Sequence, residues 1–249
     1  DAVPESGGRN TEMEELPLKQ HKHINPFAQD IIQRYLLFII GLFFSAMGVA
    51  ITKKGELGVS PISSVANVMS IRLPQLSLGY WLIIWNCALI LGQILLLRQK
   101  FQWIQLLQVP LSFLFGWFTD FGVWLISFFT PTKYWMQICL VIAGTIVLGF
   151  GISLAVIANV ILNSGEAFVK ALSDTIHKEF GNVKVFFDVS CVGIAVLLSF
   201  LFFHKLVGTR EGTIFAALCT GFVVKFFNRL LKKPLETFLV KSIEPDMKK

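Results

Sequence analysis

Six long apolar segments constrain the fold of this chain more than any other feature of its sequence. Each runs for about 20 residues with few charges, the length that an α-helix needs to cross the roughly 30 Å hydrocarbon core of a bilayer. They are Tyr35–Thr52, Tyr80–Leu97, Ile104–Ile126, Trp135–Ala158, Val185–Phe203 and Thr213–Leu230. Because backbone groups find no water inside hydrocarbon, such segments must be helical. The sequence predicts an all-α integral membrane protein with six transmembrane helices.

The composition supports a protein that lies in lipid. Of the 249 residues, 54% are hydrophobic and 15% are charged, whereas average proteins carry about 25% charged residues. This balance excludes a disordered chain and a small disulfide-stapled domain. The net charge of +6 could indicate nucleic acid as a partner, but the Lys and Arg residues mostly lie outside the apolar segments. The lipid bilayer explains this distribution better, and we expect no nucleic acid partner.

Six spans place both termini on the same side of the membrane. That side carries fifteen of the 22 Lys and Arg residues and the opposite side six, so the positive-inside rule predicts cytoplasmic termini. Residues 1–34 are expected to form a polar, largely disordered tail with a short interfacial helix at Pro26–Arg34 and no cleavable signal peptide. Residues 231–249 are expected to form a basic cytoplasmic tail.

The two halves of the chain share a pattern of glycine and polar residues. Shifts of 102 to 105 residues align Gly41 with Gly144, Gly48 with Gly151, Asn86 with Asp188, and Asp120 with Lys225. The pattern predicts an internal duplication, with residues 35–126 as the first repeat and 135–230 as the second. Each repeat has three spans, an odd number, so the second must cross the membrane in the opposite sense. This is the inverted-topology plan of many secondary transporters.

A short amphipathic segment follows the first span of each repeat. Ser60–Arg72 opens with Ser-Pro, a helix start signal, and its length of about 20 Å is too short to span the bilayer. Ser164–Phe180 carries apolar and charged residues at every fourth position, and Gly181 is expected to cap its C-terminus. Such segments either enter the membrane as re-entrant helices or lie on its surface. We favour partial insertion for the first and a surface position for the second.

Ionisable residues at membrane depth are costly and often mark a transport pathway. Asp120 and Lys225 occupy matching positions, where they could form a buried ion pair or hold two ends of a substrate, unless both lie at interfaces with Lys225 reaching water. Asp188 could instead stabilise the N-terminus of the fifth span. The candidates for ion coupling or gating are Asp120, Glu166, Asp188 and Lys225.

The polar starts of the two short segments form a second candidate site. Hydroxyls, amides and free backbone N–H groups at a helix N-terminus attract anions and carboxylates. The candidate substrate-binding residues are Ser60, Ser63, Asn67, Asn86, Asn163 and Ser164. The alternative for these residues is ordinary helix capping. Gln93, Gln105 and Gln108 either line a cavity or bond neighbouring helices.

The sequence carries no recognisable motif of an enzyme. It lacks a paired-histidine zinc motif, a phosphate-binding glycine loop and a nucleophile elbow, so we expect no catalytic residues, no cofactor and no metal site. His21 and His23 alone do not predict a metal site. The four cysteines lie inside predicted spans without metal-like spacing and are expected to pack as small apolar residues: Cys87, Cys139, Cys191 and Cys219.

Several short motifs resemble those of the YczE/YyaS/YitT-like family of bacterial membrane proteins. They are Gly58-Val59-Ser60-Pro61, Leu106-Leu107-Gln108 leading into Phe115-Gly116 and Asp120, and Lys184 with Asp188. The resemblance covers roughly residues 35–230. It implies a multipass protein of the bacterial cytoplasmic (inner) membrane with a poorly defined role, and it carries over no substrate.

Inverted repeats, short helices and buried charges together favour a small secondary transporter or exporter. Such a protein would bind a polar, anionic or zwitterionic solute where the halves meet, couple it to H⁺ or Na⁺, and expose the site to each side in turn. Two other classes stay open: a lipid-binding or lipid-flipping protein, and a non-transporting partner or regulatory subunit. A homodimer is one assembly to expect, because small six-span proteins often pair.

Overall fold

The computed structural model describes residues 26–241, and all regular structure in this part of the chain is helical. The helices are α1 (Pro26–Lys54), α2 (Pro61–Arg72), α3 (Leu78–Leu97), α4 (Gln108–Leu125), α5 (Tyr134–Ala158), α6 (Ser164–Ile176), α7 (Phe180–Phe203) and α8 (Glu211–Lys241). Two short 3₁₀ helices, Arg98–Lys100 and Trp103–Leu107, connect α3 to α4. The predicted all-α class is therefore confirmed.

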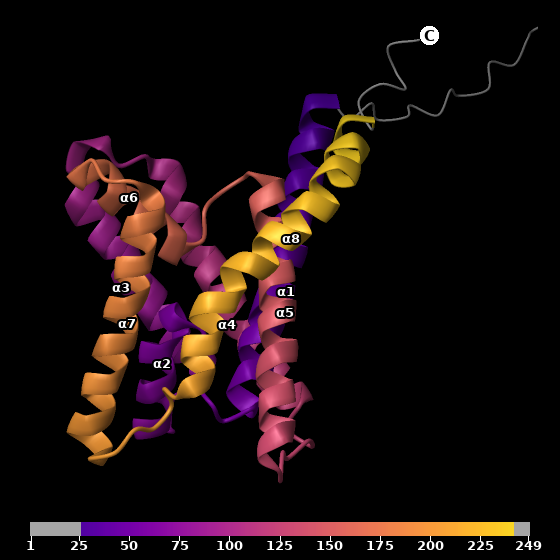
Figure 1. Ribbon diagram of the computed structural model, residues 1–249. Coiled ribbons are helices and arrows are strands. Elements are labelled where there is room, and N and C mark those ends of the chain that lie inside the picture. Colours follow the sequence, from indigo (N-terminus) through magenta and orange to yellow (C-terminus); the bar gives the residue numbers. More distant parts are fainter. Residues whose placement is uncertain (1–25, 242–249) are drawn as a thin grey trace, which may run out of the picture.

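Six of these helices, α1, α3, α4, α5, α7 and α8, are long and apolar enough to cross a membrane. They run up and down between the two ends of the bundle, and the first turn of α1 and the last turn of α8 lie at the same end (Figure 1). We call this the terminal end and the opposite one the loop end. The loop end holds the C-terminus of α1, the connection between α4 and α5, and the segment that joins α7 to α8.

Helices α1 and α5 form the most extensive contact in the bundle. A Cβ atom added to Gly41 would lie 2.7 Å from the carbonyl oxygen of Gly151, and one added to Gly48 would lie 2.7 Å from that of Gly144. Gly144 and Gly151 are the counterparts of Gly41 and Gly48 in the predicted duplication. Each glycine of α1 thus contacts the counterpart of the other, the reciprocal pattern that a two-fold axis gives to a self-complementary interface.

The short helices α2 and α6 pack among the long ones, and most residues of α2 are buried. Helix α2 lies against α7, where Val65 and Val68 cover Ala195, whereas α6 lies against α3. Their N-terminal ends meet, because a Cβ atom on Gly165 would lie 2.8 Å from the Cδ1 atom of Ile62. These two residues are also counterparts at a spacing of 103.

Several helix limits differ from the predicted ones. Helix α6 ends at Ile176 rather than Phe180, because His177 takes a left-handed φ of 52° and its N–H bonds the carbonyl of Ser173. Gly181 therefore lies in the first turn of α7 and does not cap α6. Residues 26–34, expected as a separate interfacial helix, continue into α1 without a break. Helix α8 extends eleven residues beyond the predicted Leu230 and includes Pro234.

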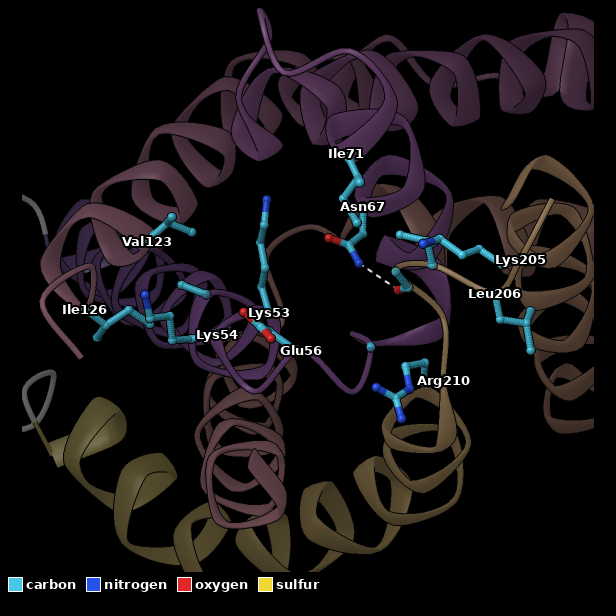
Figure 2. A pocket seen from close by; sticks show the side chains of 14 residues that line it. Lys53, Lys54, Glu56, Asn67, Ile71, Val123, Ile126, Lys205, Leu206 and Arg210 are labelled. Carbon is cyan, nitrogen blue, oxygen red and sulfur yellow. Dashed lines mark hydrogen bonds between the residues drawn. The ribbon is translucent and has the colours of Figure 1, made fainter. Parts of the chain in front are cut away.

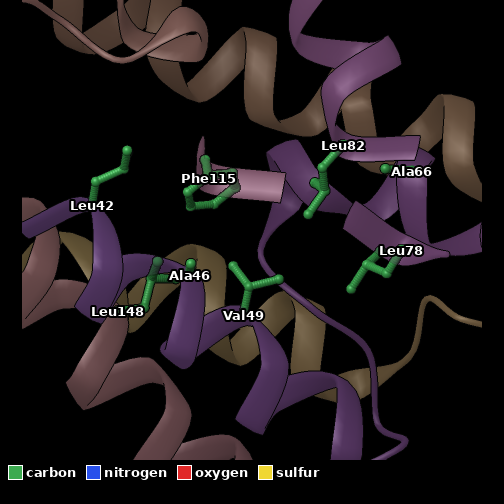
Figure 3. Close-up of a cluster of buried hydrophobic side chains, with 8 residues drawn as sticks. All are labelled: Leu42, Ala46, Val49, Ala66, Leu78, Leu82, Phe115 and Leu148. Atoms are coloured by element: carbon green, nitrogen blue, oxygen red, sulfur yellow. The ribbon is translucent and has the colours of Figure 1, made fainter. Parts of the chain in front are cut away.

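A buried apolar cluster joins residues from the first and second halves of the chain (Figure 3). It joins five helices through Leu42, Ala46, Val49, Ala66, Leu78, Leu82, Phe115 and Leu148. Helix α8 contributes nothing to this cluster and packs chiefly on α5, where Phe227 meets Phe150 edge to face. Only 6% of its most apolar window is buried, against 50% for α1 and α5, so α8 is the most peripheral of the long helices.

Candidate functional site

A cavity of about 560 Å³ lies at the loop end of the bundle. Five structural segments form its wall: the C-terminal end of α1, the connection between α1 and α2, the second half of α2, the C-terminal end of α4 and the connection between α7 and α8 (Figure 2). The lining residues are Ala50, Lys53, Lys54, Glu56, Gly58, Asn67, Ile71, Val123, Ile126, Lys205, Leu206, Val207, Gly208 and Arg210. Its volume falls within the range of small-molecule sites, about 300–1,000 Å³.

The charge of the cavity wall is strongly positive. Lys53 and Lys54 come from the end of α1, and Lys205 and Arg210 from the connection between α7 and α8, whereas Glu56 is the one acidic residue among those that line it. Cations grouped in a cleft with apolar walls focus the electric field and concentrate anions. The cavity is therefore suited to a small anion.

The two lysines of α1 bond neutral oxygens. Lys53 donates from Nζ to the Ser70 hydroxyl at 3.3 Å, and Lys54 donates to the Ser127 carbonyl at 3.2 Å. These bonds position both ammonium groups, and the Asp120 carboxylate is close enough to interact with the charge of Lys53. Arg210 pairs with Glu211 at 3.1 Å, where both side chains are about half exposed, so water screens that pair.

Asn67 presents an unpaired acceptor to the cavity. Its Nδ2 atom donates to the Gly208 carbonyl at 2.7 Å, which fixes the orientation of the amide because a carbonyl can only accept. Figure 2 shows the Oδ1 atom on the side of the amide that faces the cavity, and this atom is buried with no hydrogen-bond partner in the part of the chain that the structure describes. The hydroxyls of Thr209 and Thr213, beside the same wall, are also buried without a partner. Buried polar atoms are normally hydrogen-bonded, so this set is unusual.

Two glycines allow the cavity wall to close tightly. Gly58 has a φ of +110° and Gly208 a φ of +76°, conformations that other residues rarely adopt. A Cβ atom at Gly58 would lie 2.1 Å from the Thr213 hydroxyl oxygen. The extended segment before α2 can therefore lie directly against the start of α8 only with glycine at this position.

A second polar cluster surrounds the N-terminus of α6, nearer the terminal end. Gln93 donates to the Gln108 side chain at 3.1 Å and to the Ser164 carbonyl at 3.2 Å, and the hydroxyls of Ser112 and Ser164 are 3.1 Å apart. These four side chains are buried and largely satisfy one another. The sequence left two interpretations open for Gln93 and Gln108, as residues that line a cavity or as residues that bond neighbouring helices. Their hydrogen bonds support the second.

Three charged residues lie beside that cluster. Lys184 and Asp188, one turn apart on α7, form an ion pair of 2.5 Å. Glu166 is close enough to interact electrostatically with both charges. Its Oε2 atom is buried and has no hydrogen-bond partner among the described residues. Glu166 belongs to α6, which is not one of the six helices long enough to span a membrane. Burial raises the pKa of its carboxyl above the ordinary value, and the positive charge of Lys184 acts in the opposite direction. The structure thus brings together two of the predicted coupling residues, Glu166 and Asp188.

Asp120 and Lys225 are not brought together. The Asp120 carboxylate caps the N-terminus of α3, where it accepts from the Gly79 N–H at 2.8 Å and from the Ser77 hydroxyl. Lys225 is exposed on α8. Within residues 26–241 no ion pair joins them, and the position of Asp120 accounts for its carboxylate as a helix cap.

The other predicted substrate-binding residues lie apart from the cavity. The Ser60 and Ser63 hydroxyls bond each other at 2.9 Å near the start of α2. Asn163 caps α6 by accepting from the Ser164 N–H at 3.1 Å, as ordinary capping predicts. Asn86 is buried within α3. Asn67 alone of the six predicted residues lines the cavity.

The sequence reasoning missed the four basic residues of the cavity. It treated Lys53, Lys54, Lys205 and Arg210 as ordinary loop charges in the orientation count. The signal that could have identified them is their distribution: the side predicted to be poor in cations carries six, and these are four of them.

Comparison with known proteins places this chain by family. A model of a family of unknown function, DUF6198, matches residues 32–229. The chain belongs to this family. The match covers the whole cavity wall and all of the long helices except the first turns of α1 and the C-terminal part of α8, and it assigns no role to any of them. Among curated proteins and among solved structures, none matches the chain.

Proposed function

We propose that this protein is a small secondary transporter that moves a small anionic or zwitterionic solute by alternating access. The observation that carries the proposal is the cavity at the loop end, with four basic side chains and one acidic side chain around a volume of about 560 Å³. Basic side chains outnumber acidic ones in this wall, and such an excess of positive charge in a cleft concentrates anions. A binding site for an anion accounts for these cations.

The arrangement of helices supports alternating access. The reciprocal glycine contacts between α1 and α5, and the meeting of Ile62 with its counterpart Gly165, are what a pseudo-two-fold axis between inverted repeats would produce. We propose that α2 and α6 are re-entrant half-helices that enter from opposite sides and meet near the bilayer midplane. For Ser164–Phe180 this departs from the surface position that we favoured from the sequence, because the start of α6 contacts the start of α2. The cavity would lead from the loop end towards this meeting point, and the polar cluster around α6 would close the path from the terminal end.

We propose H⁺ as the coupling ion and Glu166 as the group that carries it. Its carboxylate is buried, lacks a hydrogen-bond partner at Oε2 and faces the pair formed by Lys184 and Asp188 on α7. Protonation would remove a buried charge at the N-terminus of α6, the short helix that meets α2. A proton that binds Glu166 near the terminal end could therefore affect the cavity at the loop end through the contact between α6 and α2.

We further propose that the protein resides in a bacterial cytoplasmic membrane with both termini in the cytoplasm, in keeping with its charge distribution and with the resemblance to YczE/YyaS/YitT-like proteins. In this orientation the cavity opens away from the cytoplasm. The concentration of cations there favours capture of an anion from outside, so we expect uptake rather than export.

The test is uptake by purified protein in liposomes, preceded by a thermal-stability screen against small organic acids, amino acids, inorganic anions and lipids. A solute at 100 times its dissociation constant adds about 2.7 kcal/mol of stability. We expect a small acid to stabilise the protein and to be taken up. The variant Lys205→Gln should weaken binding, whereas Lys133→Gln, which removes a charge at the same end outside the cavity, should not.

Other outcomes would favour the two remaining classes of protein. Stabilisation by lipids alone, without uptake of any soluble acid, would indicate a lipid-binding or lipid-flipping protein. No stabilisation by any class, together with a stable complex with another membrane protein, would indicate a partner or regulatory subunit. Equal effects of Lys205→Gln and Lys133→Gln would contradict the assignment of the cavity as the binding site.

A further inference from the structure

The cavity wall indicates which functional groups the solute carries in addition to its negative charge. This inference rests on the proposed function, in which the cavity is the solute site of a transporter. Besides its cations, the wall contains a buried acceptor, the Oδ1 atom of Asn67, that has no hydrogen-bond partner among the described residues. The side chain is only 4% exposed, and its other amide atom is held by Gly208. A buried acceptor without a hydrogen-bond partner destabilises the empty site, and a ligand that donates to it removes this cost.

Asn67 and the basic residues line the same cavity from different segments of the chain. Asn67 projects from α2 towards the interior of the cavity, and the side chain of Lys53 extends into the same space from α1 (Figure 2). Lys205 and Arg210 belong to the segment that carries Gly208, the partner of the Asn67 amide. A small molecule within the cavity can therefore reach the cations and Asn67 at the same time.

We infer that the solute is a small carboxylic acid with a hydrogen-bond donor on the adjacent carbon, an α-hydroxy or α-amino acid. Its carboxylate would lie among Lys53, Lys205 and Arg210, and its hydroxyl or ammonium group would donate to Asn67 Oδ1. The carboxylate of Glu56, also in the wall, would favour an ammonium group over a hydroxyl. A simple acid without a donor would leave the Asn67 acceptor unsatisfied and would bind less well.

Three acids with the same carbon skeleton test this inference: L-lactate, L-alanine and propionate. They differ only in the substituent at the second carbon, which is a hydroxyl, an ammonium group or hydrogen. Dissociation constants are measured by titration calorimetry on the purified full-length protein. We expect lactate or alanine to bind about tenfold more tightly than propionate, the ratio that one hydrogen bond to a buried acceptor provides.

Two variants assign the discrimination to the proposed atoms. Asn67→Ala should reduce the ratio between the better acid and propionate to about one, whereas Lys205→Gln should weaken all acids that bind and leave the ratio unchanged. Because the wild-type comparison needs no variant, poor folding of Asn67→Ala would not prevent a decision. Equal affinity for all three acids would overturn this inference but leave the proposed transporter intact. Binding of none of them would overturn the inference, and only the wider solute screen then decides the proposed function.

Discussion

The packing of α1 against α5 leads to a prediction about stability with a built-in control. A Cβ atom at Gly48 would lie 2.4 Å from the backbone nitrogen of Leu148, and one at Gly151 would lie 2.3 Å from that of Ser45. Ordinary van der Waals contact begins near 3.4 Å, and a backbone atom cannot rotate away as a side chain can. Alanine at either position therefore requires the two helices to separate by about 1 Å.

The cost follows from the position of this contact. Overpacking a well-packed core destabilises by about 1–3 kcal/mol, and the upper end applies where backbone atoms clash. For a chain of this size about 3 kcal/mol corresponds to a fall in melting temperature of roughly 6–12 °C. Because Gly48 and Gly151 are counterparts in the proposed repeats and meet similar obstacles, Gly48→Ala and Gly151→Ala should destabilise by similar amounts.

The assay is thermal unfolding in detergent, followed by intrinsic tryptophan fluorescence. Gly193→Ala on α7 and Gly221→Ala on α8 are matched controls, since an added Cβ atom there meets nothing within 4 Å. These should leave the melting temperature unchanged or raise it slightly, as alanine favours helix over glycine. If Gly48→Ala melted with the controls, the close approach of α1 and α5 would be refuted.

Two further predictions concern the acidic residues. Asp120→Asn should lower stability by about 1 kcal/mol through loss of the cap on α3, measured by melting temperature. Solute binding, measured by calorimetry, should be retained or become tighter, because the Asp120 carboxylate interacts with the charge of Lys53. A loss of binding in a stable variant would instead make Asp120 part of the solute site. Because burial raises the folded pKa of Glu166 above its ordinary value of 4.5, its contribution to stability is complete below that value and is lost as the pH rises through the folded pKa. Melting temperatures between pH 4 and 8 should therefore fall more steeply in the wild type than in Glu166→Gln, and identical profiles would exclude this role.

The sequence predicted the helical framework well because apolar length is a local property. Every one of the six spans was found, and most limits that agreed, such as Leu97 for α3 and Ala158 for α5, lie where the apolar run itself ends. The limits that failed depend on particular bonds. Helix α6 ends early because Ser173 bonds the backbone around His177, and a pattern of every fourth residue does not contain that information.

The site was harder to predict because it depends on contacts between distant parts of the chain. Asn67 and Gly208 are 141 residues apart, and only the fold places Lys53 and Lys205 around the same volume. Asp120 illustrates the opposite error. A carboxylate in an apolar run suggested a transport role, yet the N-terminus of α3 is close enough to bind it, and sequence spacing could not reveal that partner.

The excess of cations around the cavity has a practical consequence for anyone who purifies this protein. A positively charged cleft will hold whatever small anion the solution supplies, so phosphate, citrate or acetate buffers would compete with the solute being sought. A competitor at 100 times its own dissociation constant lowers the apparent affinity of a second ligand about 100-fold. Bulky buffers with a low concentration of small anions are therefore the conditions in which a weak physiological ligand becomes visible.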